Sequence, residues 1–474
     1  MNGSSWFGAL RARIAGAPAL IVRERVKRGA VLVFFAALFV AHWPLLQPLL
    51  QNGDSAVYNR QIADRFLGER TTHMGYMALG MVFDRVLPFS TDLNMNLMLL
   101  VVGLLGLAAV YSSAKLLGGS RLAALATVPL ALGLSAQVRG MLLSEVDVVS
   151  VSFVALSFAC FLREKAFFSG LLFGYSVLVT PLSGPLLTVF VASAAVRGLA
   201  NPGGVRRQVR KLFVFGLGSL LVYLPAVLFF FQDYVHGPRG VLNAPRASLS
   251  VPERALHSWH FISGELGYLL PLYAAGALVC LLNRRLWRAG QPALALLLST
   301  AVMAVVGERF LDVPVQLPNL VLLGMLPAIA FAVSRPLIRI GLLALFCACF
   351  LNVKSSYASL LGELERRSRS RELCLAIRAQ SAPQGMVLVG LPGWSEPRMY
   401  ERYAASPEQS AESVEWRSFL RRRERWLEPA AAVQIWFFHK VSSGDVARLL
   451  QRYSLENRTV GKRKFKVLVP RAEQ

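Results

Sequence analysis

The sequence predicts an α-helical polytopic membrane protein with about eleven transmembrane helices, followed by a small C-terminal α/β domain outside the membrane. Of the 474 residues, 55% are hydrophobic and 16% are charged, whereas soluble domains average about 45–50% apolar and about 25% charged residues. The apolar residues form blocks of the roughly 20 residues that cross a bilayer as a helix. This composition excludes a soluble enzyme, a disordered chain and a disulfide scaffold.

The candidate spans follow a basic juxtamembrane segment at residues 1–29. The first span is not a cleavable signal peptide, because its apolar stretch is too long and lacks a small-residue cleavage site. Residues 166–197 fit either two short helices or one helix broken around residues 181–185. The predicted spans are residues 30–50, 94–114, 121–137, 146–162, 166–180, 183–197, 212–232, 264–282, 292–307, 317–334 and 338–353.

The basic residues predict the orientation of these spans. If the N-terminus is cytoplasmic and the spans alternate, the cytoplasmic side receives twenty Lys and Arg against Glu24 and Glu164. The outer loops and the adjoining ends of the spans then hold nine Arg, no Lys and twelve Asp or Glu. Short cytoplasmic loops are enriched in Lys and Arg, so we expect the N-terminus inside and the C-terminus outside. Most basic residues of the membrane part then lie beside the anionic inner leaflet as determinants of topology, which explains much of the net charge of +24. No nucleic-acid-binding motif accompanies it, so we do not expect a nucleic-acid partner.

The composition changes after residue 353, and no later segment is apolar enough to span a bilayer. Residues 386–390 and 433–438 have the pattern of strands, and residues 443–453 that of a helix. Residues 459–469 suggest a hairpin around Gly461. We therefore expect residues 354–474 to form a periplasmic α/β domain, separate from the membrane domain at residues 30–353.

Polar residues gather at the outer ends of the spans rather than at mid-depth. Ion-coupled transporters usually bury ionisable residues at mid-depth, so this distribution disfavours a transporter and favours a site at the outer interface, where a lipid-linked substrate would lie. Residues 56–67 and 74–86 of the first outer loop, residues 51–93, have the pattern of short amphipathic helices. The polar residues at the span ends are Asp54, Gln137, Arg139, Glu145, Asp147, Glu308, Arg309, Asp312 and Gln316.

Three motifs at these outer ends resemble the GT-C class of integral-membrane glycosyltransferases, and bacterial relatives of the protein O-mannosyltransferases in particular. Those relatives show Gly-Asp-Ser, then His-Pro-Pro-Gly-Tyr, then Ala-Glu-x-Tyr. Here Gly53-Asp54-Ser55 matches fully. His73-Met74-Gly75-Tyr76 is one residue shorter and lacks both prolines, and Ser144-Glu145-Val146-Asp147 keeps the glutamate without the tyrosine.

The resemblance implies a GT-C-like membrane domain in a bacterial inner membrane. It implies transfer of a sugar from a polyprenyl-phosphate donor to a lipid, glycan or protein acceptor, with inversion at the anomeric carbon. Asp54 would be the general base and Glu145 a second catalytic carboxylate. The other substrate-binding candidates are His73, Tyr76, Arg139, Asp147, Arg309 and Gln316, with Arg309 first for the donor phosphate and Arg139 next.

The residues also allow other interpretations. Asp54 has the position of a helix N-cap, and Arg309 that of an interfacial anchor paired with Glu308. No metal-ligand set is predicted, and metal dependence is open because some GT-C branches use a divalent cation and others none. The rival functions are a lipid or glycan transporter or flippase, and a non-catalytic membrane assembly protein on a GT-C scaffold.

Overall fold

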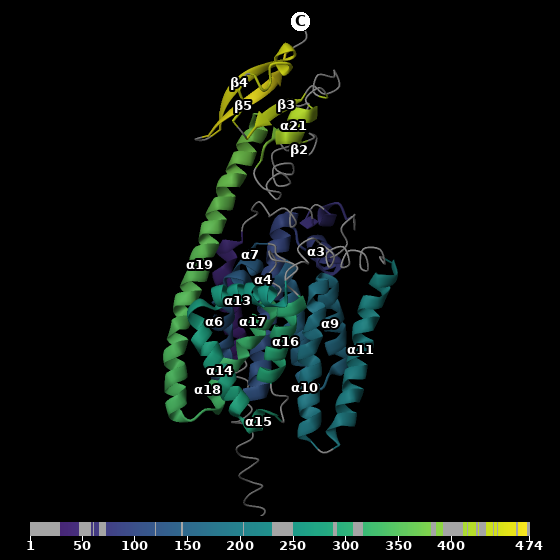
Figure 1. The fold of residues 1–474 in the computed structure, drawn as a ribbon, viewed down its shortest axis with the longest axis vertical. Coiled ribbons are helices and arrows are strands. Elements are labelled where there is room, and N and C mark those ends of the chain that lie inside the picture. Colours follow the sequence, from purple (N-terminus) through teal and green to yellow (C-terminus); the bar gives the residue numbers. More distant parts are fainter. Residues whose placement is uncertain are drawn as a thin grey trace, which may run out of the picture. The chain divides into compact units, whose positions relative to one another are not determined.

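The chain divides into two compact units, Met1–Gln47 and Pro48–Gln474. The computed structural model (Figure 1) describes residues 29–46, 58–59, 61–65, 73–118, 120–143, 146–201, 203–229, 250–287, 292–306, 316–380, 385–391, 411–414, 416–422, 425, 433–438, 440–442, 444–460 and 463–471. In the first unit these residues form an apolar helix, Gly29–Leu45, which ends in the 3-10 helix η1 (Trp43–Leu45). It coincides with the first predicted span.

Apolar helices dominate the second unit, as the sequence predicts. In chain order they are α3 (Met74–Val86), α4 (Thr91–Gly118), α5 (Arg121–Leu125), α6 (Thr127–Leu132), α7 (Ser135–Leu142), α8 (Val146–Leu162), α9 (Ala166–Val179), η3 (Pro181–Leu186), α10 (Leu187–Ala200), α11 (Gly204–Phe229), α13 (Val251–Leu266), η6 (Gly267–Leu269), α14 (Leu270–Leu282), α15 (Arg284–Trp287), α16 (Pro292–Val306), α17 (Leu317–Leu323), α18 (Met325–Val333) and α19 (Pro336–Ala379).

Every predicted span coincides with an apolar helix, which confirms the helical polytopic fold. Among the described residues, five helices are long and apolar enough to cross a membrane, and a pair bent by 79° adds a sixth. The others are shorter, so eleven crossings stay a prediction. The long helices are Thr91–Gly118, Ser183–Ala200, Gly204–Ala226, Ala255–Leu282 and Pro336–Ala379, and the shorter ones Gly29–Leu45, Val146–Leu162, Ala166–Val179, Pro292–Val302 and Leu317–Val333.

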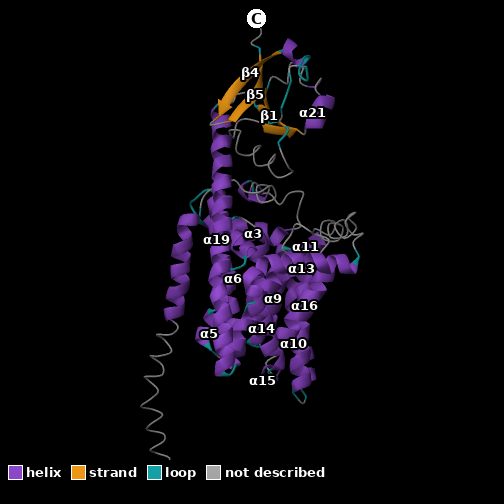
Figure 2. Ribbon diagram, turned by 60° about the vertical axis from the view of Figure 1, so that its left-hand side comes forward, coloured by secondary structure: helices purple, strands orange, loops and turns teal. Residues whose placement is uncertain are grey.

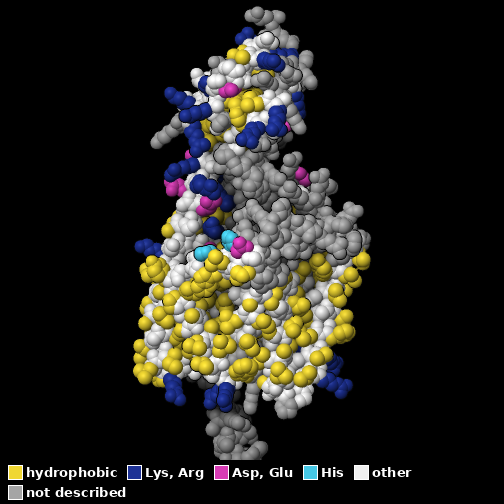
Figure 3. Space-filling view, in the orientation of Figure 1, with side chains coloured by type: hydrophobic (Ala, Val, Ile, Leu, Met, Phe, Trp, Pro, Cys, Tyr) yellow, Lys and Arg dark blue, Asp and Glu magenta, His cyan; other side chains and the backbone are white. Residues whose placement is uncertain are grey.

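The helix ends that the sequence predicts to be cytoplasmic lie together at one end of the bundle. Figures 1 and 2 show α15 and the connection between α10 and α11 at this end, while α3 and α7 lie towards the opposite end. Figure 3 shows a hydrophobic belt on this face, with Lys and Arg at its lower edge and with Lys, Arg, Asp, Glu and His above it. The side of the membrane on which each end lies stays a prediction.

Glycines allow α9 and α11 to pack with their backbones in contact. Gly170 and Gly174 form a GxxxG pattern on α9, the arrangement that lets membrane helices approach closely. A Cβ built on Gly174 would lie 2.5 Å from the Ser219 carbonyl oxygen, and one on Gly170 would overlap the Phe215 carbonyl. The Ser219 hydroxyl donates to the Gly170 carbonyl oxygen at 3.1 Å. The two helices are therefore held by backbone proximity as well as by apolar packing.

The predicted span at residues 121–137 is bent, because α6 ends at Gly133 and α7 departs at 79°. Distant side chains satisfy the backbone groups that the bend leaves free. The Ser356 hydroxyl donates to the Gly133 carbonyl oxygen at 2.8 Å. Glu265 accepts a hydrogen bond of 2.9 Å from the Ala136 amide at the start of α7, where a negative charge also favours the helix dipole.

The last membrane helix, α19, continues through residue 354, where the sequence predicts the start of a separate domain. Its 44 residues would measure about 66 Å, about twice the hydrocarbon thickness of a bilayer. Pairs of charged side chains at helical spacing support the part beyond residue 354: Glu363 with Arg366 and Arg367, and Glu365 with Arg369. The helix thus runs unbroken from the membrane domain into the C-terminal domain.

The C-terminal domain is a mixed sheet of five strands in the order β2-β1-β3-β5-β4. β1 pairs in parallel with β2 and β3, and β5 pairs antiparallel with β3 and β4. One face packs on Cys374 and Ile377 at the end of α19, and the other on Phe419 of α21 (Trp416–Arg422). The strands are β1 (Met386–Val389), β2 (Ala411–Val414), β3 (Gln434–Phe437), β4 (Tyr453–Val460) and β5 (Arg463–Pro470).

The two predicted strands and the predicted hairpin are confirmed in this domain, but the predicted helix at residues 443–453 is wrong. Its described residues form turns and the short 3-10 helix η10 (Leu449–Gln451). Asp445 accepts hydrogen bonds from the amide and the hydroxyl of Ser442, both at 2.8 Å, but no α-helix follows. The helix does not continue because β4 begins at Tyr453, which pairs with Pro470 of β5.

Candidate active site

The His73–Tyr76 motif opens α3 and is fastened to the end of α9. The Nδ1 atom of His73 lies 2.6 Å from the Val179 carbonyl oxygen. Since a carbonyl oxygen can only accept, Nδ1 carries the proton of this hydrogen bond. The Tyr175 hydroxyl donates to the Gly75 carbonyl oxygen at 2.7 Å. A Cβ on Gly75 would lie 2.8 Å from the Val179 amide nitrogen, so this docking requires a glycine.

Aromatic packing sets the orientation of His73. The Tyr58 ring meets the His73 ring nearly edge-on, with 5.3 Å between their centroids, and meets the Tyr76 ring at 5.8 Å. Tyr76 is fully buried, in a hydrophobic cluster that includes Met77 and Val179. His73 is only half-buried. The structure therefore places Tyr76 in the core behind the motif and His73 at its accessible side.

A buried carboxylate lies beside this cluster. Asp92, in the first turn of α4, is 8% exposed and accepts a hydrogen bond of 2.8 Å from the Asn59 side-chain amide. Asn59 is fully buried and follows Tyr58 in the chain. An acid at a helix N-terminus is stabilised by the helix dipole. Asp92 thus anchors the segment that carries Tyr58 to α4, and Tyr58 in turn positions His73.

Helix α7 presents polar atoms that lack partners. Among the described residues, the Nε atom of Arg139 and the Oε1 atom of Gln137 are buried with no hydrogen-bond partner. Such groups are uncommon in folded proteins and call for a ligand or a functional reason. A guanidinium group suits phosphate in particular, because it can donate two parallel hydrogen bonds to its oxygens. Arg139 lies on the helix that the 79° bend turns away from the span axis.

Gln316 and Asp147 have different surroundings. Gln316 is 1% exposed, and its amide donates to the Thr300 carbonyl at 3.4 Å and accepts from Asn319 at 3.1 Å. The Ser299 hydroxyl extends this network by donating to Asn319 at 3.0 Å. Gln316 is therefore engaged in holding α16 against α17. Asp147 lies half-buried in the first turn of α8.

Comparison with known proteins now identifies the fold. No protein-family model matches the chain, and no curated protein matches it in sequence. The solved structures that are similar to the chain include two crystal structures of ArnT from Cupriavidus metallidurans, one bound to undecaprenyl phosphate and one in the apo state. Both have a TM-score of 0.61, with 13% and 15% sequence identity, over 93% of this chain and 98% of theirs. The chain has the GT-C fold. The resemblance inferred from the three motifs is confirmed at this level.

Only part of the predicted GT-C site lies among the described residues. Asp54, Glu145 and Arg309 lie outside them, together with Glu308 and Asp312, so their roles stay predictions. His73, Tyr76, Arg139, Asp147 and Gln316 are placed as described above. In the part of the chain that the structure describes, no group of three or more His, Cys, Asp or Glu side chains could hold a metal ion.

Sequence reasoning missed three residues that shape this site: Asn59, Asp92 and Tyr175. An Asp at the start of a helix, such as Asp92, is usually only a helix cap. Nothing in the sequence therefore indicated that Asp92 would be buried against Asn59. Tyr175 did offer one, because a hydroxyl inside an apolar membrane helix needs a hydrogen-bond partner. The partner, the Gly75 carbonyl, lies 100 residues away in the chain and is found only in the folded structure.

Proposed function

We propose that the chain is a GT-C glycosyltransferase that uses a polyprenyl-phosphate-linked sugar donor, with its active site at the α3 and α7 end of the bundle. The observation that carries this proposal is the likeness, over 93% of the chain, to ArnT, which has been crystallised bound to undecaprenyl phosphate. The buried Nε atom of Arg139 on α7, which has no hydrogen-bond partner among the described residues, supports it independently, because a donor of this kind brings a phosphate that needs a cation.

Arg139 would stabilise the departing polyprenyl phosphate. Negative charge grows on the phosphate as the glycosidic bond breaks, so a cation placed there in advance lowers the barrier. The Nε atom of Arg139 is buried, where its attraction for a phosphate is screened less than in water. Arg309, the first candidate from sequence, would supply a second cation. This assignment makes Arg139 a donor-binding residue.

Asp54 would be the general base. Inversion at the anomeric carbon needs a carboxylate on the face opposite the leaving group, where it takes the proton of the acceptor hydroxyl. Glu145 would be a second carboxylate, and Asp147 would orient the sugar or the acceptor. His73, which its Nδ1 contact with the Val179 carbonyl holds in place, would line the substrate site.

The test needs no knowledge of the acceptor. The purified full-length chain in lipid nanodiscs would be given a panel of undecaprenyl-phosphate-linked sugars with a cell-envelope extract, and release of undecaprenyl phosphate would be measured. We expect Asp54→Asn to slow release by about 10²–10⁴-fold. The matched control is Asp64→Asn, which changes an exposed carboxylate in the same loop. Arg139→Ala should weaken binding of the donor lipid, measured without acceptor.

The outcomes separate the parts of the proposal. Normal release by the Asp54→Asn enzyme would refute the general-base role, and unchanged donor binding by Arg139→Ala would place the phosphate elsewhere. A wild-type chain that released undecaprenyl phosphate from no sugar in the panel, yet moved the intact lipid across a vesicle membrane, would favour the transporter instead.

A further inference from the structure

A second feature lies at the base-rich end of the bundle, away from α3 and α7. There, the loop between α8 and α9 and the first turns of α11 line an open pocket of about 530 Å³. Four basic residues face it: Lys165 from the loop, and Arg207, Arg210 and Lys211 from α11. The glycosyl-transfer proposal makes no use of these residues, so the pocket needs its own explanation.

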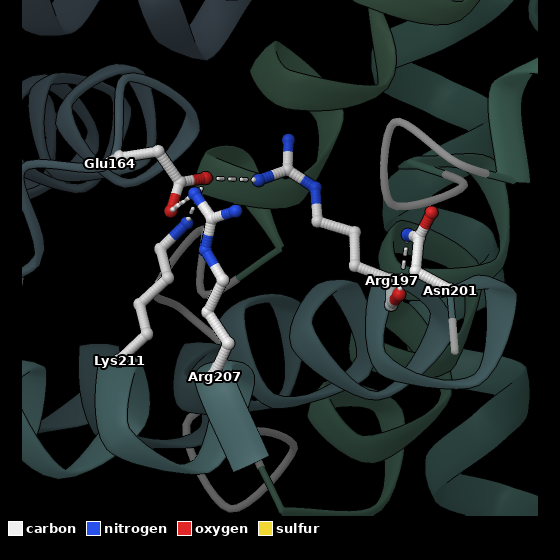
Figure 4. A network of polar contacts seen from close by, with 5 residues as sticks. All are labelled: Glu164, Arg197, Asn201, Arg207 and Lys211. Atoms are coloured by element: carbon white, nitrogen blue, oxygen red, sulfur yellow. Dashed lines mark hydrogen bonds and ion pairs between the residues drawn. The ribbon is translucent and has the colours of Figure 1, made fainter. Parts of the chain in front are cut away.

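Glu164 fixes part of this basic cluster, as Figure 4 shows. Its carboxylate lies 2.9 Å from Lys211 Nζ, 3.0 Å from Arg197 and 3.5 Å from Arg207. Lys211 is nearly buried, with its Nζ atom 3.9 Å from the centre of the Phe161 ring. One carboxylate therefore orders three cations and neutralises one of them, so the cluster keeps a net positive charge.

Two further bases remain available for a ligand. Among the described residues, neither Lys165 nor Arg210 has an ion-pair or side-chain hydrogen-bond partner, and both line the pocket. Bases next to an ordered cation cluster, and facing an open cavity, attract an anion with several acceptor oxygens. The pocket therefore fits a phosphate group.

The rest of the wall is mostly apolar and continues onto exposed apolar side chains of α9 and α11. Phe167 and Phe168 line the pocket and are 41% and 60% exposed. Two turns further along the pocket-lining face of α11, seven residues beyond Arg210 and Val214, Leu217 and Leu221 are also exposed, and only 22% of the most apolar window of this helix is buried. A ligand with hydrocarbon chains attached to its phosphate would cover this surface, whereas a soluble phosphate would not.

We propose that this pocket binds an anionic phospholipid, with its phosphate against Lys165 and Arg210 and its acyl chains along the exposed face of α9 and α11. Basic pockets between membrane helices favour lipids of this charge. The site would tie the α8–α9 and α11 connections to one leaflet. It is independent of the proposed glycosyl transfer.

The experiment measures binding of phosphatidylglycerol to the detergent-purified full-length chain by native mass spectrometry. Phosphatidylcholine with the same acyl chains is the neutral reference. Near an anionic surface, each Lys or Arg contributes about fivefold in affinity, or about 1 kcal/mol. Lys165→Ala with Arg210→Ala should therefore weaken phosphatidylglycerol binding by about 25-fold and leave phosphatidylcholine binding unchanged. Charge-preserving Lys165→Arg with Arg210→Lys should retain it.

The matched control is Arg284→Ala with Arg285→Ala, which removes two exposed bases of α15 at the same end of the bundle but outside the pocket. This pair should change binding less than about twofold; a loss equal to that of the pocket variant would overturn the proposal in favour of diffuse attraction. Inorganic phosphate, titrated as a second probe, should bind at least about tenfold more weakly, because it lacks acyl chains. Equal affinity would overturn the lipid assignment.

Discussion

Replacing Gly170 by alanine tests the backbone contact between α9 and α11. The new Cβ would overlap the Phe215 carbonyl and lie 2.9 Å from the Ser219 amide nitrogen. Both neighbours are backbone, so no side-chain rotation relieves the overlap and the helices must separate. Overpacking costs about 1–3 kcal/mol, and loss of the Ser219 hydrogen bond about 0.5–1.5 kcal/mol. The gain in helix propensity offsets about 1 kcal/mol, which leaves a net loss of about 1–3 kcal/mol.

The control is Gly216→Ala on α11, where a Cβ meets nothing within 4 Å. This change should be neutral or stabilising by up to about 1 kcal/mol. Unfolding can be followed with a thiol-reactive dye, because Cys280, Cys349 and Cys374 are fully buried and react only once the fold opens. Gly170→Ala should lower the midpoint temperature and Gly216→Ala should not. Equal midpoints for the two variants would refute the backbone-contact argument.

Four further predictions concern the network at Glu164, the docking of α3, the junction between α13 and α14, and the topology. Burial raises the pKa of Glu164, but the hydrogen bond from Lys211 and the neighbouring cations outweigh it and hold the pKa below its ordinary value of 4.5. The stabilisation from this network should therefore be fully present above pH 4.5 and be lost as the pH falls through the lower pKa that Glu164 has in the folded protein. Thermal melts at a series of pH values check this, and the midpoint temperature of Glu164→Gln should depend less on pH than that of the unaltered chain. Tyr175→Phe should cost about 0.5–1.5 kcal/mol by freeing the Gly75 carbonyl, and should raise the rate of hydrogen exchange across α3 while leaving α19 unchanged. Asn352→Ala should cost about 1–3 kcal/mol, because its amide donates to the Leu266 carbonyl at 2.7 Å and accepts from the Tyr268 amide at 3.0 Å; an unaltered thermal midpoint would contradict this role. A C-terminal reporter active only outside the cytoplasm is expected, and one active only inside would reverse the predicted orientation.

Much of the membrane fold could be predicted from sequence because hydrophobic length is a local property. A helix in lipid must satisfy its own backbone, so an apolar block near 20 residues long indicates both a helix and its approximate ends. The same logic located the strands at residues 386–390 and 433–438, which became β1 and β3. It failed at residues 443–453, where pairing of Tyr453 with Pro470 overrides a local helical pattern.

The candidate site, like the fold, was predictable from the sequence only in part. Its motifs can be read from residue type and spacing, and the sequence predicts that they lie at the outer ends of the spans. Which of them are available to a ligand is a tertiary property, because it depends on partners supplied by distant segments. Gln316 is engaged by Thr300 and Asn319, whereas the Nε atom of Arg139 is buried with no partner among the described residues.

The sequence by itself determined the membrane class of this protein, the positions of its apolar helices and the end of the bundle where its bases collect. These properties depend on hydrophobicity and charge summed along short segments, which folding does not alter. Only the tertiary structure decided the bend at Gly133, the docking of Gly75 on Val179 and the four bases that share a pocket between the α8–α9 loop and α11. Each of these depends on backbone groups or charges that are far apart in the chain and meet only when the helices pack.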